Sequence, residues 1–117
     1  MAKYRLSPLA EQDLEAILTW AYQEFGDEGG GRYMGLLARA IGDLAADPQR
    51  EGCLRRPELG SGALIYHLRH SRDRVLEAIG RVRKPQHFLL YRIHVDALVI
   101  VRVLHESFDL ARHLPAG

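Results

Sequence analysis

Histidine and arginine side chains recur in three segments of the chain that show the alternation of β-strands, and this combination could cleave RNA. Cleavage through attack by the 2′-hydroxyl of RNA needs a general base, a general acid and cations that stabilise the charge of the phosphorane. The candidate catalytic residues of such a nuclease are His67, Arg69, Arg92, His94 and Arg102. A basic surface that only binds a partner uses the same residue types, so we prefer the binding interpretation and keep the nuclease as an alternative.

The strands that carry these residues predict a sheet with two different faces. Successive side chains of a strand point to opposite sides. Alternation over residues 63–70, 87–94 and 98–104 gives apolar sides made of Leu64, Tyr66, Leu68, Leu89, Tyr91, Ile93, Val99, Val101 and Val103, with the histidines and arginines opposite. Residues 94–97 are expected to form the hairpin turn between the last two strands. We therefore predict one buried apolar face and one open basic face.

Two helices are expected to cover the apolar face. Residues 2–6 are a short strand candidate, Ser7 can cap a helix that Pro8 begins, and an apolar stripe continues to Gly26. Residues 27–31 indicate a glycine-rich hairpin turn, and a second apolar stripe runs from Arg32 to Asp47. Because the turn is short, the two helices should pack antiparallel.

The remaining segments complete an α+β fold in a single domain of residues 1–117, a length that suits one hydrophobic core. Residues 49–62 are expected as a loop, residues 71–86 as a basic, mobile loop, and a short helix begins at Glu106 or Ser107. The predicted architecture is an N-terminal strand, an antiparallel helical hairpin on one face of a small, mostly antiparallel sheet, and a short C-terminal helix.

Composition excludes several classes of protein. With 47% hydrophobic and 26% charged residues the chain fits a soluble globular domain, and no apolar run approaches the roughly 20 residues of a membrane helix. The start has no apolar signal core, so we expect a cytoplasmic protein. Cys53 is the sole cysteine, which excludes an internal disulfide. His67 and His70 fall on opposite faces of a strand, and the other histidines show no better ligand spacing, so we expect neither a metal nor a cofactor.

Charge is distributed unevenly, although the net charge is only +1. Residues 1–60 hold 7 Lys and Arg against 10 Asp and Glu, whereas residues 61–117 hold 9 against 5. We therefore expect the C-terminal half to offer a surface for an acidic partner, whether a nucleic acid or an acidic polypeptide.

Several motifs resemble one family of bacterial proteins. The opening YRLSPLAEQDLEAI and the closing segments LLYRI and VIVRVLHESFDLARHL, with RPELGSG and LIYHLRH between them, are similar to the ParE branch of the RelE/ParE toxins of type II toxin–antitoxin modules. The resemblance implies a RelE/ParE-like fold and a toxin that poisons DNA gyrase without a catalytic step. It also implies a ParD-like antitoxin with a ribbon-helix-helix N-terminus, a hetero-oligomer with that antitoxin, and contact with promoter DNA only through it.

The RelE branch provides the alternative function. Its members cleave mRNA on the ribosome with basic side chains and commonly a C-terminal tyrosine, whereas this sequence has no tyrosine after Tyr91. That difference favours the gyrase inhibitor over the ribosome-dependent mRNA endonuclease. A non-toxic homologue that only binds an antitoxin is the remaining alternative.

Partner contacts can be assigned on the same basis. We expect an acidic and apolar segment of the antitoxin to dock along the exposed side of the helical hairpin and an open sheet edge. Trp20 lies at the edge of the apolar stripe, so core packing is the favoured interpretation for its ring and partner binding is the alternative. The expected contacts are Trp20, Arg39 and Arg69 for the antitoxin, and Arg81, Arg83, Arg92 and Arg102 for the target.

Overall fold

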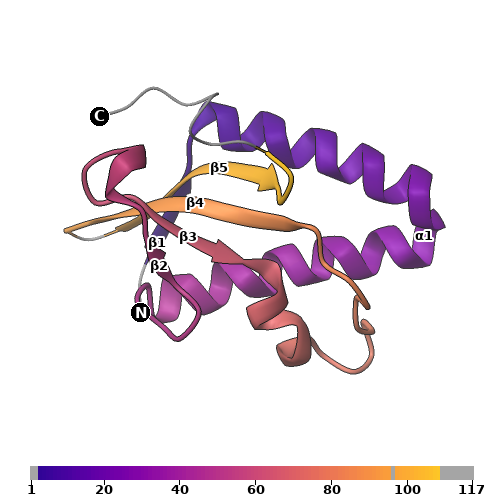
Figure 1. The fold of residues 1–117 in the computed structure, drawn as a ribbon. Coiled ribbons are helices and arrows are strands. Elements are labelled where there is room, and N and C mark those ends of the chain that lie inside the picture. Colours follow the sequence, from indigo (N-terminus) through magenta and orange to yellow (C-terminus); the bar gives the residue numbers. More distant parts are fainter. Residues whose placement is uncertain (1–2, 96, 109–117) are drawn as a thin grey trace.

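The chain forms an α+β fold in which one long, kinked helix covers a five-stranded sheet (Figure 1). A computed structural model describes residues 3–95 and 97–108. The elements follow in the order β1 (Lys3–Leu6), α1 (Pro8–Ala46), β2 (Leu54–Arg55), the 3-10 helix η1 (Pro57–Leu59), β3 (Leu64–His67), the 3-10 helix η2 (Leu68–Arg74), β4 (His87–His94) and β5 (Ala97–His105). The strand order is β1-β5-β4-β3-β2, with β1 parallel to β5 and the other neighbours antiparallel. The fold class predicted from the sequence is confirmed.

The helix α1 consists of two arms that meet at Gly26. Ser7 caps the first arm, because Ser7 Oγ accepts a hydrogen bond from the Ala10 amide at 3.0 Å. Within the helix Gly26 departs from helical geometry, with φ of 74° and ψ of −174°, and the arms run back alongside each other in Figure 1. The helical hairpin is therefore as predicted. The predicted turn at residues 27–31 is wrong, because those residues are helical and one glycine with positive φ makes the reversal.

The glycines after Gly26 allow the two arms to pack closely. Gly29 and Gly30 are buried. A Cβ atom at Gly30 would lie 2.6 Å from the ring of Tyr22 on the first arm, well inside contact distance. The glycine-rich run thus serves helix packing rather than a turn.

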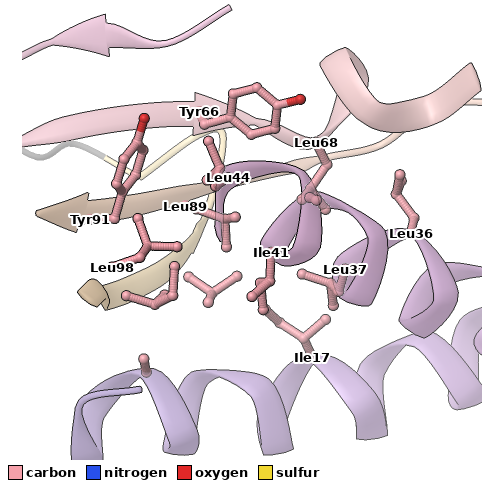
Figure 2. Packing of buried hydrophobic residues seen from close by; sticks show 14 of the residues in the cluster. Ile17, Leu36, Leu37, Ile41, Leu44, Tyr66, Leu68, Leu89, Tyr91 and Leu98 are labelled. Carbon is pink, nitrogen blue, oxygen red and sulfur yellow. The ribbon is translucent and has the colours of Figure 1, made fainter. Parts of the chain in front are cut away.

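The main core lies between α1 and one face of the sheet (Figure 2). It takes side chains from both arms of α1, from η2 and from the central strands, including Ile17, Leu36, Leu37, Ile41, Leu44, Tyr66, Leu68, Leu89, Tyr91 and Leu98. Tyr66 and Tyr91 are both 0% exposed, as the alternation predicts. Full burial of one large apolar side chain contributes about 1.5–3 kcal/mol, so this layer is the main source of stability.

A β-bulge in β5 changes which of its side chains enter the core. Tyr91 pairs with Ile100 while the preceding residue of β4 pairs two positions further along β5, so Val101 has no partner in the ladder. Leu98 and Ile100 therefore enter the core before the bulge, and Val103 enters it afterwards. The prediction that the three valines of β5 share the apolar face holds only for Val103. Val99 alternates with the core residues Leu98 and Ile100 and points away from the core, and Val101 packs against the opposite side of the sheet.

The opposite face of the sheet is covered over its centre. Leu59 of η1 and Ala63 fold over it and form a second apolar cluster with Phe88, Leu90 and Leu104, all of them at most 7% exposed. The open basic face expected from the sequence is therefore wrong, because part of the segment predicted as a loop lies across its centre.

Smaller differences concern the segments around the central strands. Residues 63–70 do not form one strand, since β3 ends at His67 and η2 follows directly. The strand β2, in a segment predicted as loop, pairs with β3. The hairpin between β4 and β5 is as predicted, with His94 opposite Ala97. The helix expected from Glu106 or Ser107 lies mostly outside the described residues.

Candidate binding surfaces

A pocket of about 370 Å³ opens beside the end of β3, and His67, Arg69 and Glu106 are among the polar residues that line it. His67 Nε2 lies 2.8 Å from Glu106 Oε1, and His67 Nδ1 accepts the Arg69 amide at 3.1 Å. Because Nδ1 accepts, Nε2 is the nitrogen that donates to the carboxylate. This hydrogen bond lowers the pKa of the Glu106 carboxyl. Both ring nitrogens of His67 are thus engaged within the protein.

The second apolar cluster separates this pocket from the basic residues at the far end of β4. Arg92 donates a hydrogen bond to the carbonyl of Ser61 at 2.9 Å. This bond holds the segment that places Leu59 and Ala63 over the sheet. His94 is exposed at the end of β4. Leu90 lies between these residues and Phe88, which lines the pocket, on the same side of the strand.

The remaining arginine of the predicted nuclease set turns toward the helix. Arg102 donates two hydrogen bonds to the carboxylate of Asp13 on α1, at 2.8 and 3.0 Å. This bonding raises the pKa of Arg102. Of the five predicted residues, the structure brings only His67 and Arg69 together in one pocket.

A larger hollow of about 500 Å³ lies between the bend of α1 and the segment that precedes β4. Its rim carries four cationic side chains around an apolar floor. We call it the cationic groove, and its lining residues are Phe25, Gly29, Arg32, Tyr33, Arg81, Val82, Arg83, Lys84 and Gln86. The groove contains two of the four residues assigned to target contacts, Arg81 and Arg83. The other two, Arg92 and Arg102, lie elsewhere, as described above.

The segment that forms one wall of the cationic groove is held against α1. The Tyr33 hydroxyl accepts the Gln86 amide at 3.0 Å and also lies 2.5 Å from His87 Nδ1. Gly80 has a φ of 91°, and a Cβ atom there would lie 2.7 Å from Arg32 Cδ. The basic segment expected as a mobile loop is therefore fixed at several points, and the glycine permits its close approach to the helix.

A third hollow, of about 250 Å³, is apolar and lies between the two arms of α1 and β1. We call it the apolar groove, and its lining residues are Tyr4, Leu6, Leu14, Met34, Leu37, Ala38, Ile41 and Gly42. It adjoins a free sheet edge, because β1 is the first strand of the sheet and, in the part of the chain that the structure describes, pairs only with β5. Such an edge offers main-chain hydrogen-bonding groups to a partner strand.

The residues assigned to antitoxin contacts lie on three separate parts of the surface. Trp20 is half-buried, and its ring packs edge-on against Tyr33 at 5.3 Å between centroids. Arg39 Nε lies 3.0 Å from Asp43 Oδ1, an ion pair without hydrogen-bond geometry. Arg69 is exposed on η2 and lines the pocket beside His67. Their roles in binding an antitoxin stay a prediction.

Sequence reasoning missed a buried carboxylate on the second arm of α1. The side chain of Asp43 is 3% exposed and accepts hydrogen bonds from Ser71 Oγ at 2.7 Å and Arg74 Nε at 3.1 Å. Arg39 and Arg50 also form ion pairs with it. These contacts join α1 to η2, so we regard the cluster as structural. The available signal was a charge within an apolar helical stripe, since Asp43 stands between Ala40 and Leu44.

Over residues 3–95 and 97–108, no three histidine, cysteine, aspartate or glutamate side chains come together in a way that could hold a metal ion. None of the helices in the same ranges is both long enough and apolar enough to cross a membrane.

The described surfaces define a small α+β protein with a cationic groove, an apolar groove beside a strand edge, and a pocket lined by His67, an arrangement typical of a protein that binds other macromolecules. Residues 4–110 match the sequence profile of the ParE toxin of type II toxin–antitoxin system, parDE, so the chain belongs to this family.

Individual relatives agree with this assignment. The chain is similar to Toxin ParE1 of Mycobacterium tuberculosis (strain CDC 1551 / Oshkosh), with 27% identity over 114 residues, covering 97% of this chain and 98% of the relative. It is 31% identical over 114 residues to Toxin ParE1 of Caulobacter vibrioides, covering 97% and 99%. A solved structure described as the chromosomal ParDE TA system from P. aeruginosa has the same fold, with a TM-score of 0.63, 16% identity, and coverage of 90% of this chain and 96% of that chain.

Proposed function

We propose that this ParE-family toxin acts in the cytoplasm by binding DNA gyrase, and that a ParD-like antitoxin with a ribbon-helix-helix N-terminus neutralises it. The observation that supports gyrase binding over RNA cleavage is the dispersal of the candidate nuclease residues. Arg102 is bonded to Asp13, and Arg92 to the Ser61 carbonyl. A phosphorane needs cations that converge on one point, and these guanidinium groups are committed elsewhere.

The apolar groove and the adjoining β1 edge support the antitoxin partner. An antitoxin helix can place apolar side chains between the arms of α1, and a following extended segment can pair with the free edge of β1. Tyr4 lines the apolar groove, is 51% exposed and does not belong to the main core. Such an exposed aromatic ring fits a side chain that a partner covers.

An assay with purified DNA gyrase tests the proposed function. Purified toxin is mixed with gyrase, ATP and relaxed plasmid, and both supercoiling and cleaved DNA are measured. We expect supercoiling to fall and cleaved plasmid to accumulate with increasing toxin, and prior incubation with the antitoxin of the same operon to abolish both effects. Unchanged supercoiling at a large molar excess of toxin would contradict the proposal.

A ribosome-dependent mRNA endonuclease is the second candidate, favoured by one observation. His67, His70, Arg56 and Arg69 do line a common pocket. Primer extension on a message translated in vitro distinguishes this function, because cuts that need ribosomes and disappear in the His67→Ala variant would support it. Expression without growth arrest and without either activity would instead favour a non-toxic, antitoxin-binding homologue.

A further inference from the structure

We propose that the cationic groove holds an acidic segment of DNA gyrase, with a bulky apolar side chain of that segment seated against Phe25 and Val82. This inference rests on the gyrase-binding function proposed above and assigns the surface that performs it.

Charge is the first argument. The rim carries Arg32, Arg81, Arg83 and Lys84, and none of the described residues that line the groove is acidic. The chain as a whole has a net charge of only +1, so these cations are a local concentration. Such a field attracts a partner segment rich in carboxylates and repels a basic one.

The acidic residues that pair with two of these cations do not prevent a partner segment from binding. Arg32 lies 3.8 Å from Glu28, whose side chain is 92% exposed. Arg81 lies 3.0 Å from Asp73, with both side chains more than 60% exposed. Ion pairs this open to solvent contribute little, so carboxylates of a partner can replace them at small cost.

The apolar floor favours a polypeptide over a nucleic acid. Phe25 is 45% exposed, and its ring packs edge-on against Trp20 at 5.3 Å, which fixes its position. An apolar centre within a charged rim is the usual anatomy of a protein–protein interface. A surface that follows a nucleic-acid backbone instead places its cations along the path of the phosphates.

The groove also requires little ordering when a partner binds. The Tyr33 hydroxyl and the close approach of Gly80 to Arg32 hold its two walls together, and Arg72 donates a hydrogen bond to the Arg83 carbonyl at 2.8 Å. A preformed groove loses less conformational entropy on binding than a loop that must first be ordered.

The position of the groove fits neutralisation by an antitoxin. The cationic groove and the apolar groove share the second arm of α1, which contributes Tyr33 to the first and Met34 and Leu37 to the second. An antitoxin bound in the apolar groove would therefore exclude a partner as large as gyrase from the cationic groove by steric overlap.

The test compares the double variant Arg83→Glu/Lys84→Glu with wild type in the gyrase supercoiling assay. Both side chains are exposed, and the carbonyl of residue 83 that Arg72 contacts is retained, so the fold should survive. We expect the toxin concentration for half-inhibition to rise at least about tenfold. Phe25→Ala should raise it as well, because the apolar seat is lost without a change of charge. Arg55→Glu, at an exposed position of β2 outside the groove, is the charge control and should stay within about twofold of wild type.

Thermal unfolding and antitoxin affinity accompany each variant. Midpoints and affinities close to those of wild type, together with weakened gyrase inhibition, support the proposal. Inhibition by the double variant equal to that of wild type overturns it, as does a loss of antitoxin affinity with gyrase inhibition retained. Binding of a fluorescein-labelled DNA duplex without gyrase, lost in the double variant, also overturns it in favour of a nucleic-acid surface. Failure of the wild-type toxin to affect gyrase at all refutes the proposed function itself and the inference with it.

Discussion

Asp13 near the start of α1 and Arg102 at the bulge of β5 form a bidentate pair that joins the helix to the sheet. The two guanidinium hydrogen bonds measure 2.8 and 3.0 Å, and Asp13 Oδ2 also accepts the Val103 amide at 2.9 Å. The bulge interrupts the strand ladder at this point, so one carboxylate satisfies both an arginine and a backbone donor.

Removing the Asp13 carboxylate should therefore destabilise the fold. The Asp13→Asn variant leaves Arg102 without its counterion, and because both side chains are at most 20% exposed, we expect the free energy of unfolding to fall by about 2–3 kcal/mol. Urea unfolding measures this change. Glu58→Gln, which removes the partner of Arg56 in an exposed pair, is the control and should have little measurable effect. Equal midpoints for Asp13→Asn and wild type would contradict the structural role of the pair.

The packing of the helical arms predicts opposite effects for two glycine substitutions. In Gly30→Ala the new Cβ atom would lie 2.6 Å from the Tyr22 ring, so the ring must move. This substitution should lower the free energy of unfolding by about 1–3 kcal/mol. Gly42→Ala, on an exposed helical position with nothing within 4 Å, should instead stabilise by up to about 1 kcal/mol, because alanine favours a helix. Thermal melting of the two variants checks both signs, and stabilisation by Gly30→Ala would refute the close contact of the arms.

His87 predicts a specific dependence of stability on pH. Burial, and after it the neighbouring His105 and His67, lower the pKa of His87 from 6.5 to about 4, with Glu106 acting weakly in the other direction. The neutral ring accepts the Tyr33 hydroxyl at Nδ1. Below pH 6.5 His87 binds a proton in the unfolded chain but stays neutral in the folded protein. The stability that this difference contributes is therefore fully present above pH 6.5 and is lost as the pH falls toward 4. The full effect is at most about 3 kcal/mol.

Urea unfolding at pH 7, 6 and 5 measures this effect before most carboxylates titrate. We expect His87→Asn to show a smaller loss of stability over this range than wild type, because its side chain does not ionise. His94→Asn, at an exposed position, should follow the wild-type profile. Parallel profiles for His87→Asn and wild type would show that His87 is not the group responsible.

Antitoxin binding can be tested at the two predicted arginines, with different designs for each. Arg69 is exposed, so Arg69→Glu should lower the affinity for an acidic antitoxin about tenfold, as measured by calorimetry. Arg39→Glu would place a second carboxylate beside the buried Asp43 and destabilise the fold, so Arg39→Gln is the cleaner variant. Unchanged affinity in Arg69→Glu, with Arg55→Glu as the charge control, would remove Arg69 from the antitoxin surface.

Local patterns in the sequence predicted the elements whose environment depends on close neighbours. Alternation placed Tyr66 and Tyr91 in the core, and the Ser7-Pro8 pair located the start of α1. These features depend on strand and helix periodicity, which is visible within about ten residues.

Features that depend on distant segments could not be predicted in the same way. The bulge at Val101 reverses the inward and outward positions of β5, and no local signal marks it. Cover of the sheet by Leu59 and Ala63 requires knowledge of where that loop lies in space. The dispersal of Arg92 and Arg102 follows from these two features, which is why the candidate nuclease set looked continuous in the sequence.

The pairing of β1 with β5 also determines when the sheet can finish forming during synthesis of the chain. Lys3–Leu6 pair with residues 97–100, and Ser7 Oγ donates a hydrogen bond to the Val101 carbonyl, 94 positions away. During synthesis the first strand leaves the ribosome long before its partner exists, so this edge of the sheet forms only after residue 101 has emerged. A nascent chain therefore lacks the β1 edge, and a neutralising protein that binds there would recognise finished toxin molecules and ignore those still being made.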